Sequence, residues 1–133
     1  MIKLYVSPEG DKYTKHFQPR ELRCRCEHCN MQEPHGYTDA QLIQIEKLRM
    51  ALGRAYTPNS AYRCALHPIE AAKANPGKGP HTMYGAEDIP CHGAEQRGKV
   101  VSEALALGAK GIGIAKSYVH VDWRPGALFI WSY

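Results

Sequence analysis

The sequence predicts a single α+β domain with two main helices and a small antiparallel sheet. The chain has 133 residues, of which 44% are hydrophobic, and this suffices for one domain with a modest core. Two segments carry apolar residues at helical spacing, and three short strand candidates follow them at the end of the chain. Helices separated in sequence from a terminal run of strands are typical of the α+β class.

Residues 1–36 are expected to be the irregular part of this domain. They mix turn residues, cysteines and charges without a clear period. We therefore predict irregular structure with at most one short strand or one turn of helix, lying as a flap over the rest of the chain. Nothing in residues 1–133 indicates an internal repeat or a second domain.

The first long helix is predicted from Thr38 to about Gly53. Thr38 and Gln41 have the spacing of a capping box, and Gly53 is a typical helix stop. Apolar residues recur at helical spacing at Leu42, Ile45, Leu48 and Leu52. A second long helix is predicted over Ala94–Leu107, because Gly108 lies just past its last apolar residues.

Shorter elements are predicted between and after the two helices. Tyr56–Arg63 has an extended pattern, which Pro58 limits to a sheet edge or a strand start. Pro68 can begin a short helix that reaches Ala74, and the sequence NPGKGP at 75–80 is typical of a loop. The three strand candidates are Gly111–Ala115, Tyr118–Trp123 and Leu128–Trp131.

Charge and hydropathy restrict the partners only weakly. The formal net charge of +4 favours an anionic partner, but cell-wall polymers, nucleic acids and acidic membranes all satisfy this condition. The N-terminus, MIKLYVSPEGDKYTKHF, lacks the apolar run of a secretory signal, and no segment is apolar enough to span a bilayer. We therefore expect a protein that is made in the cytoplasm and has no membrane span.

The five cysteines allow more than one interpretation. Their odd number argues against a complete disulfide framework and favours a reducing origin. A C-x-C-x-x-C motif consists of Cys24, Cys26 and Cys29. His35 can complete this motif as a structural zinc site with four ligands. The interpretation that we favour is that these thiols are packed together, or that one of them pairs with Cys64.

Two further functions for the cysteines have less support. A zinc knuckle beside Arg20, Arg23 and Arg25 would be suited to contact nucleic acid. The paired C-x-x-C spacings are absent, however, and no aromatic residues alternate with the basic ones, so we expect no nucleic-acid partner. Catalysis by Cys64 or Cys91 as a nucleophile needs a nearby histidine, and no spacing indicates one.

Two motifs contain residues that are able to bind a metal ion. In GPHTMYGAEDIPCHG, His81 and Asp88 are seven residues apart, and the small residues between them let the backbone turn so that both side chains reach one ion. In YVHVDW, strand alternation places His120 and Asp122 on the same face. Taken alone, each motif also fits an ordinary loop or an exposed strand. Arg63, which ends the segment SAYR, adds a guanidinium that can bind a carboxylate or an oxyanion.

These motifs resemble those of peptidase family M15, which contains zinc D-Ala-D-Ala carboxypeptidases and phage endolysins and shares its fold with the hedgehog signalling domain. Its members carry an arginine after a Ser-x-Tyr-like strand, then S-x-H-x-x-G-x-A-x-D, then H-x-D near the C-terminus. Here the corresponding segments read SAYR, GPHTMYGAED and HVD, in the same order. The similarity extends to Phe17, Cys24 and Cys26 and so covers most of the chain. It implies a hedgehog/D-Ala-D-Ala-peptidase-like form of the α+β domain.

For the site, the resemblance implies one catalytic zinc ion with His81, Asp88 and His120 as ligands. Two imidazoles and a carboxylate suit zinc, and three protein ligands leave a fourth position open, as catalytic zinc sites require. Zinc in such a site makes water a nucleophile near neutral pH and polarises the carbonyl that is attacked. Arg63 would then stabilise the oxyanion or hold a carboxylate of the substrate.

Two departures from the family pattern concern the site. Several members have an acid three residues before the last histidine ligand, where this chain has Ser117, which is unsuited as a general base. Asp122 is the nearest replacement, and it can either serve as the base or orient His120 from behind. Gly79 stands where the motif usually has serine, which removes a hydrogen bond and not a metal ligand. Glu87 should point away from the site in an extended segment.

The function expected from the resemblance is that of a zinc metallopeptidase acting on the stem peptides of bacterial peptidoglycan. It would be a D-Ala-D-Ala carboxypeptidase or an endolysin-like endopeptidase. A small, basic domain without a signal favours a phage-encoded lysis enzyme that reaches the cell wall with a holin-type partner and acts as a monomer. The alternative is a catalytically inactive zinc-binding domain that binds the cell wall or another partner, and the missing acid at Ser117 supports it.

Overall fold

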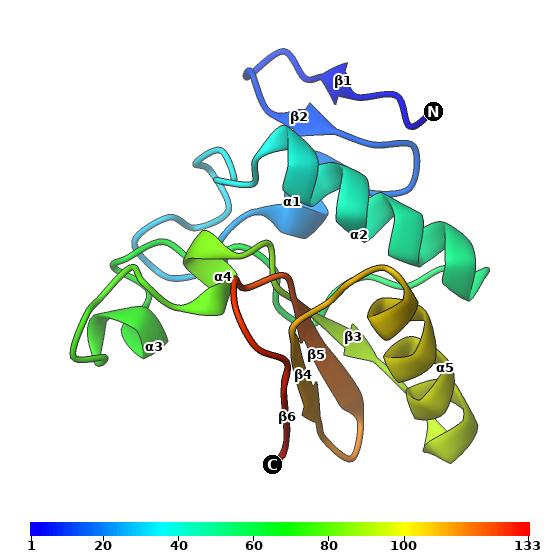
Figure 1. Cartoon of the computed structure of the whole chain (residues 1–133). Helices are drawn as coiled ribbons and strands as arrows, with labels where there is room; N and C mark the ends of the chain where they lie inside the picture. The colour runs from blue at the N-terminus through cyan, green and yellow to red at the C-terminus, as the bar shows by residue number, and fades with distance from the viewer.

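Two helices of 14 residues each organise the fold, α2 (Asp39–Leu52) and α5 (Gly93–Ala106). The computed structural model describes residues 1–133 and is drawn in Figure 1. Thr38 caps α2 by accepting a hydrogen bond from the backbone N–H of Gln41, and Gly53 ends it with a left-handed φ of 65°. Both helices are confirmed, with each end within one residue of its predicted position.

A four-stranded mixed sheet forms the centre of the domain. Its strands, in spatial order, are β3 (Glu87–Pro90), β5 (Tyr118–Asp122), β4 (Gly111–Ile114) and β6 (Phe129–Ser132). The β3/β5 and β4/β5 pairs are antiparallel, whereas β4 and β6 are parallel. The sequence did not predict β3, which occupies the free edge of β5. The chain after β5 therefore pairs with the other edge of β4, and this makes the sheet mixed.

The remaining elements are short. A two-stranded antiparallel sheet is formed by β1 (Tyr5–Val6) and β2 (Lys12–Tyr13), and the three helical turns are α1 (Pro19–Leu22), α3 (Pro68–Ala71) and α4 (Pro80–Met83). The N-terminal region is thus more regular than predicted, and α3 ends before Ala74. The predicted extended segment before Arg63 makes a single bridge, from Ser60 to Asp88 at the outer edge of β3.

The two faces of the main sheet differ in character. On one face, apolar strand residues pack against α2 and α5, and these buried residues include Leu48, Leu52, Ile89, Val100, Ala104, Ile112, Val119 and Val121. A second cluster around Phe17, Leu22 and Leu42 joins α2 to the N-terminal region. In Figure 1, α5 lies on one side of the sheet and α3 and α4 lie on the other. The face toward α3 and α4 is left for polar residues.

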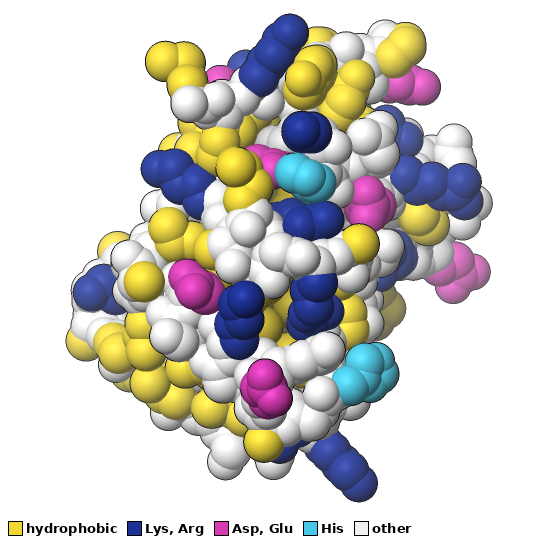
Figure 2. Space-filling view, turned by 90° about the vertical axis from the view of Figure 1, so that its right-hand side faces the viewer, with side chains coloured by type: hydrophobic (Ala, Val, Ile, Leu, Met, Phe, Trp, Pro, Cys, Tyr) yellow, Lys and Arg dark blue, Asp and Glu magenta, His cyan; other side chains and the backbone are white.

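The surface charge is dispersed on the face that Figure 2 presents. Lys and Arg side chains are spread over this face, with acidic and apolar side chains between them, and they form no continuous basic patch there. No helix of the structure combines the length and the apolar character needed to cross a membrane.

Candidate metal centre

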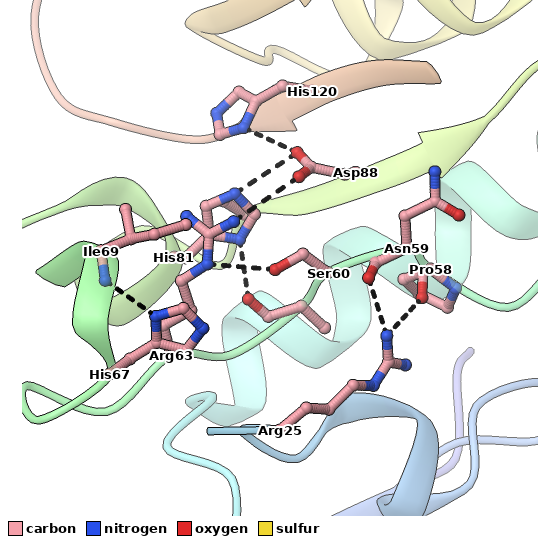
Figure 3. Close-up of polar contacts among 12 residues, drawn as sticks. Arg25, Pro58, Asn59, Ser60, Arg63, His67, Ile69, His81, Asp88 and His120 are labelled. Atoms are coloured by element: carbon pink, nitrogen blue, oxygen red, sulfur yellow. Dashed lines mark hydrogen bonds and ion pairs between the residues drawn. The ribbon is translucent and has the colours of Figure 1, made fainter. Parts of the chain in front are cut away.

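Three side chains converge on the polar face of the sheet, and they are the three predicted ligands. His81 comes from α4, while Asp88 and His120 are direct partners in the β3/β5 ladder. His81 Nε2 lies 3.3 Å, and His120 Nδ1 3.1 Å, from the same oxygen, Asp88 Oδ1 (Figure 3). The possible ligand atoms of the three residues all lie within 4.8 Å of one another. This buried triad can therefore hold one metal ion.

A tight turn after α4 brings His81 and Asp88 together. Gly85 has a φ of 64°, which only glycine adopts without strain, and a Cβ there would lie 2.8 Å from the side chain of Gln41. Gln41 also donates a hydrogen bond to the carbonyl of Met83 at 2.8 Å, which ties the turn to α2. In the M15 motif the glycine comes three residues after the first histidine. This chain has Tyr84 at that position, and its glycine, Gly85, comes one residue later.

Each histidine is oriented by a hydrogen bond on the side away from Asp88. His81 Nδ1 lies 2.7 Å from the carbonyl oxygen of Ala61, which can only accept, so this nitrogen carries a proton. His120 Nε2 lies 2.6 Å from Asp122 Oδ2 and donates to that carboxylate. The other nitrogen of each ring faces Asp88 Oδ1 and is the one available to a metal ion.

The three ligands affect one another's protonation. Burial alone would raise the pKa of Asp88, but hydrogen bonds from His120 and His81 outweigh it and hold that pKa well below its usual range. Burial lowers the pKa of His81, only partly offset by Asp88. Burial also acts to lower the pKa of His120, but hydrogen bonds to Asp122 and Asp88 leave it raised. If the triad binds a metal ion, protons would therefore compete with it most strongly at His120.

Asp122 lies behind His120, fully buried and out of the cleft. Its Oδ1 accepts hydrogen bonds from the backbone N–H and Nε of Arg124 at 3.0 and 2.9 Å. Arg124 Nη2 lies 2.7 Å from Asp122 Oδ2, the oxygen that also bonds His120. Burial would raise the pKa of Asp122, but Arg124 and His120 outweigh it and hold the pKa well below its usual range. Because both oxygens of Asp122 already accept hydrogen bonds, this residue is better suited to orient His120 than to act as a general base.

Two glycines of β4 make room for these groups. Gly111 pairs with Asp122 and Gly113 with His120 in the β4/β5 ladder, so both lie under the polar face. A Cβ at Gly111 would collide with the Asp122 carboxylate, and one at Gly113 would lie 2.6 Å from the indole nitrogen of Trp131. The alternation of glycine and isoleucine in GIGI is the signal for this packing. Arg124 was also not predicted as part of the site. Its signal in the sequence is the alternation in HVDWR, which places it on the same side as His120 and Asp122.

A cleft of about 340 Å³ opens beside the triad. Arg63 lines it: Nε donates to Ser60 Oγ at 3.1 Å, and Nη2 lies 3.9 Å from Asp88 Oδ2 (Figure 3). Other walls come from Lys73 and from the aromatic side chains of Tyr118, Trp131 and Tyr133. Asp88 is the only acidic side chain in the lining. Of the five predicted site residues, four line the cleft and Asp122 supports it from behind.

The structure explains the departures from the M15 motif at Gly79 and at Ser117. The backbone N–H of Gly79 donates to Glu70 Oε1 at 3.1 Å, and a Cβ there would lie 2.6 Å from that carboxylate. Glu70, which also pairs with Lys73 at 2.6 Å, thus fills the space of the usual serine. Ser117 is exposed and offers the sheet only its carbonyl, which accepts a hydrogen bond from the N–H of Cys91 at 2.9 Å.

Glu87 points away from the site, as predicted. It lies fully buried on the apolar side of the sheet, where its carboxyl accepts a hydrogen bond from the hydroxyl of Tyr56. Burial raises its pKa to about 8, against the hydrogen bond from Tyr56, so the carboxyl is protonated at neutral pH.

A second group of metal-binding side chains lies in the N-terminal region. It consists of Cys24, Cys26, Cys29 and Cys64. The sequence suggested His35 as the fourth ligand of a structural zinc site, and this was wrong. His35 Nε2 instead lies 2.6 Å from the carbonyl oxygen of Lys12. All five cysteines are free thiols. Neither Cys64 nor the fifth cysteine, Cys91, hydrogen-bonds to a histidine, so no cysteine–histidine pair is formed.

Comparisons with protein-family models, with curated proteins and with solved structures found no match to the chain.

Proposed function

We propose that this protein is a zinc metallopeptidase that hydrolyses peptide bonds in the stem peptides of bacterial peptidoglycan. One observation carries the proposal. His81 and His120 each direct one ring nitrogen at the same oxygen of Asp88, while the other nitrogen is engaged by Ala61 or Asp122. This arrangement fixes the ring orientations that a metal ion needs.

The donor set fits zinc in type and number, and its two separations to Asp88 Oδ1 are close to those around zinc. Two imidazoles and one carboxylate are common ligands of catalytic zinc, and three of them leave one position for a substrate or water. Ligands of a tetrahedral zinc with bonds of about 2.0–2.1 Å lie roughly 3.3–3.4 Å apart. The separations of 3.3 and 3.1 Å from the histidine nitrogens to Asp88 Oδ1 agree with this spacing.

The residues around the triad suit the hydrolysis of a peptide bond. When bound, zinc would supply a Lewis acid and lower the pKa of water toward neutrality. Arg63 presents its guanidinium at the cleft beside Asp88, where it can stabilise an oxyanion or grip a carboxylate. Burial raises the pKa of Tyr118, so its phenol stays protonated and can donate a hydrogen bond into the cleft.

The cleft also supports a substrate that combines carboxylates with an extended backbone. Arg63 and Lys73 give it basic walls, and Tyr118, Trp131 and Tyr133 add flat apolar ones. Peptidoglycan stem peptides carry free carboxylates along a short chain, which basic walls attract. A D-Ala-D-Ala carboxypeptidase would place the terminal carboxylate at Arg63, whereas an endolysin-like endopeptidase would place the oxyanion there.

A second candidate function is a catalytically inactive zinc-binding domain that binds the cell wall or another partner. One observation favours it: Asp88 is the only acidic side chain in the lining of the cleft, so no other is placed to act as a general base. Under this alternative, the triad and the cleft would hold a metal ion and a ligand without turnover.

The test is to incubate the zinc-loaded protein with purified peptidoglycan, with and without a chelator, and to identify the released fragments by mass spectrometry. The proposal predicts chelator-sensitive release of D-alanine or of cross-bridge peptides. His120→Ala should abolish this release, because it removes one ligand and the contact to Asp122. His92→Ala is the matched control, since His92 is exposed and lies outside the cleft.

The outcomes separate the two candidates. Release that is lost in His120→Ala and kept in His92→Ala supports the peptidase. If no fragment is released while the triad retains its metal ion, the peptidase proposal fails for this substrate and the binding domain is favoured.

A further inference from the structure

Four thiols meet at one point between the N-terminal region and the segment that carries Arg63. The sulfur of Cys64 lies 3.7 Å from that of Cys24, 3.6 Å from that of Cys26 and 3.3 Å from that of Cys29. All four sulfurs lie within 4.8 Å of one another. Simple packing of apolar side chains does not require four sulfurs to point at a common centre.

The backbone of the N-terminal region is folded around these sulfurs. The N–H of Cys29 donates to the sulfur of Cys26 at 3.4 Å, and the N–H groups of Asn30 and Met31 turn back to the carbonyls of Cys26 and Cys24. Asn30 and Met31 have positive φ values of 46° and 59°. Such values are uncommon outside glycine, and they persist where the surrounding structure fixes the turn.

The chemistry of four thiols favours zinc. Thiolates are soft ligands, and a set of four cysteines is a common structural zinc site. Sulfurs around a tetrahedral zinc with bonds of about 2.3 Å lie roughly 3.8 Å apart, close to the 3.3–3.7 Å observed to the sulfur of Cys64. A disulfide would need two sulfurs about 2.0 Å apart, whereas the sulfur of Cys64 lies at least 3.3 Å from each of the others and all four thiols are free.

We propose that Cys24, Cys26, Cys29 and Cys64 bind a second zinc ion, which has a structural role. Binding would release the protons of the coordinating thiols to solvent and would leave no position open for chemistry. Cys64 is the only ligand from outside the N-terminal region. The ion therefore fastens residues 24–29 to the chain directly after Arg63, one of the residues that line the cleft.

Other contacts show that these two segments are held together as a unit. Arg25 Nη1 donates to the carbonyls of Pro58 and Asn59 at 3.0 and 2.8 Å (Figure 3). The N–H of Tyr62 donates to the carbonyl of Leu22 at 3.2 Å. Arg25 is thus engaged with the protein's own backbone, and the thiol cluster ties the end of the same segment.

The experiment counts metal ions in the full-length protein and replaces them with cobalt. The protein is purified under reducing conditions with zinc, its zinc is measured by mass spectrometry, and a cobalt-loaded sample is examined for the thiolate-to-cobalt charge-transfer band. The proposal predicts two zinc ions per chain and a strong band. Cys64→Ser should lose one zinc ion and most of this band.

Two further variants complete the design. Cys91→Ala is the matched control: it removes a buried thiol that lies outside the cluster, and it should keep both ions and the band. His120→Ala should lose the other zinc ion and keep the charge-transfer band. The band of the unmodified protein tests the proposal even if Cys64→Ser does not fold.

Two results would overturn the proposal: a reduced, cobalt-loaded protein without the charge-transfer band, or a folded Cys64→Ser variant that keeps both zinc ions. These outcomes are independent of the proposed hydrolysis. If the band is missing but hydrolysis is chelator-sensitive, only the proposal of a second zinc site fails. If the band is present but no hydrolysis occurs, only the peptidase proposal fails.

Discussion

The thiol cluster and the histidine–aspartate triad are both buried groups of metal-binding side chains, but they differ in number and support. The triad has three donors, which sit on a sheet and a helical turn and border a cleft of about 340 Å³. The thiol cluster has four donors, which sit on turns of the N-terminal region and on the loop at Cys64. A tetrahedral ion is completed by four protein ligands but left open by three.

This difference assigns the two groups different roles. At the triad, both histidines have a second partner that fixes the direction of the ring: Ala61 for His81 and Asp122 for His120. Such support is what an open site needs, because its ligands must keep their positions when a substrate exchanges with water. At the thiol cluster, the proposed ion would itself hold the turns together. Four predictions follow, of which the first two test this contrast and the last two test the packing of the sheet that carries the triad.

Arg63→Lys should reduce catalysis strongly without removing either metal ion. The guanidinium lies at the cleft but is not a ligand, and loss of an oxyanion-stabilising donor lowers kcat by about 100- to 1,000-fold. If Arg63 instead holds a substrate carboxylate in ground and transition states alike, KM should rise with little change in kcat. Steady-state kinetics separate the two, with the exposed Arg20→Lys as control. Unchanged kinetics would exclude Arg63 from the site.

Asp122→Asn should weaken metal binding at the triad by about 10- to 100-fold, because the carboxylate orients His120. The thiol cluster should keep its metal ion, since Asp122 makes no contact with it. Competition with a chromophoric chelator measures both affinities. A general-base role would give a different result: kcat would fall while the affinity of the triad stayed the same.

Gly111→Ala should destabilise the protein by about 1–3 kcal/mol, because the added methyl would collide with the Asp122 carboxylate in a packed layer. Gly98→Ala is the matched control on α5, where no atom lies within 4 Å of an added Cβ. That change should stabilise the helix by up to about 1 kcal/mol. Urea unfolding at fixed zinc concentration gives both values, and equal effects would mean that the polar face is not tightly packed.

Glu87 should make stability fall with rising pH. Its pKa is about 8 in the folded protein against an ordinary value of 4.5, so between these values the folded state holds a proton that the unfolded state has lost. The free energy of unfolding should therefore decrease by up to about 1.4 kcal/mol per pH unit over this range and level off above it. Glu87→Gln has no carboxyl at this position and should not show this pH-dependent loss of stability. A pH-independent difference between the two proteins at constant zinc would contradict the burial of a protonated carboxyl.

Local patterns predicted only the parts of the triad that are close in the sequence. Strand alternation placed His120 and Asp122 on one face, and the seven-residue spacing brought Asp88 to His81 through a turn at Gly85. The order of the long helices followed from capping and helical spacing in the same way. Each of these relations involves residues that are close in the sequence. The resemblance joined His120 to Asp88, which lies 32 residues earlier.

The remaining features depend on contacts between distant segments. Cys64 joins a motif 35 to 40 residues earlier, and no spacing rule connects the two. The strand β3, with sequence EDIP, has two acids and a proline and no strand signature, although its pairing with β5 sets the topology of the sheet. β3 was missed because tertiary packing outweighed local propensity. Cys64 was predicted only as a possible disulfide partner of one of these thiols, and the structure instead brings all four free thiols together.

The most direct test of the contrast between the two groups is a crystal structure of the zinc-loaded protein with anomalous diffraction measured at the zinc edge. Two peaks are predicted: one within bonding distance of four sulfurs, and one between His81, Asp88 and His120 with a fourth position facing the cleft. A triad without a peak, or with a fourth protein ligand closing it, would contradict an open catalytic site.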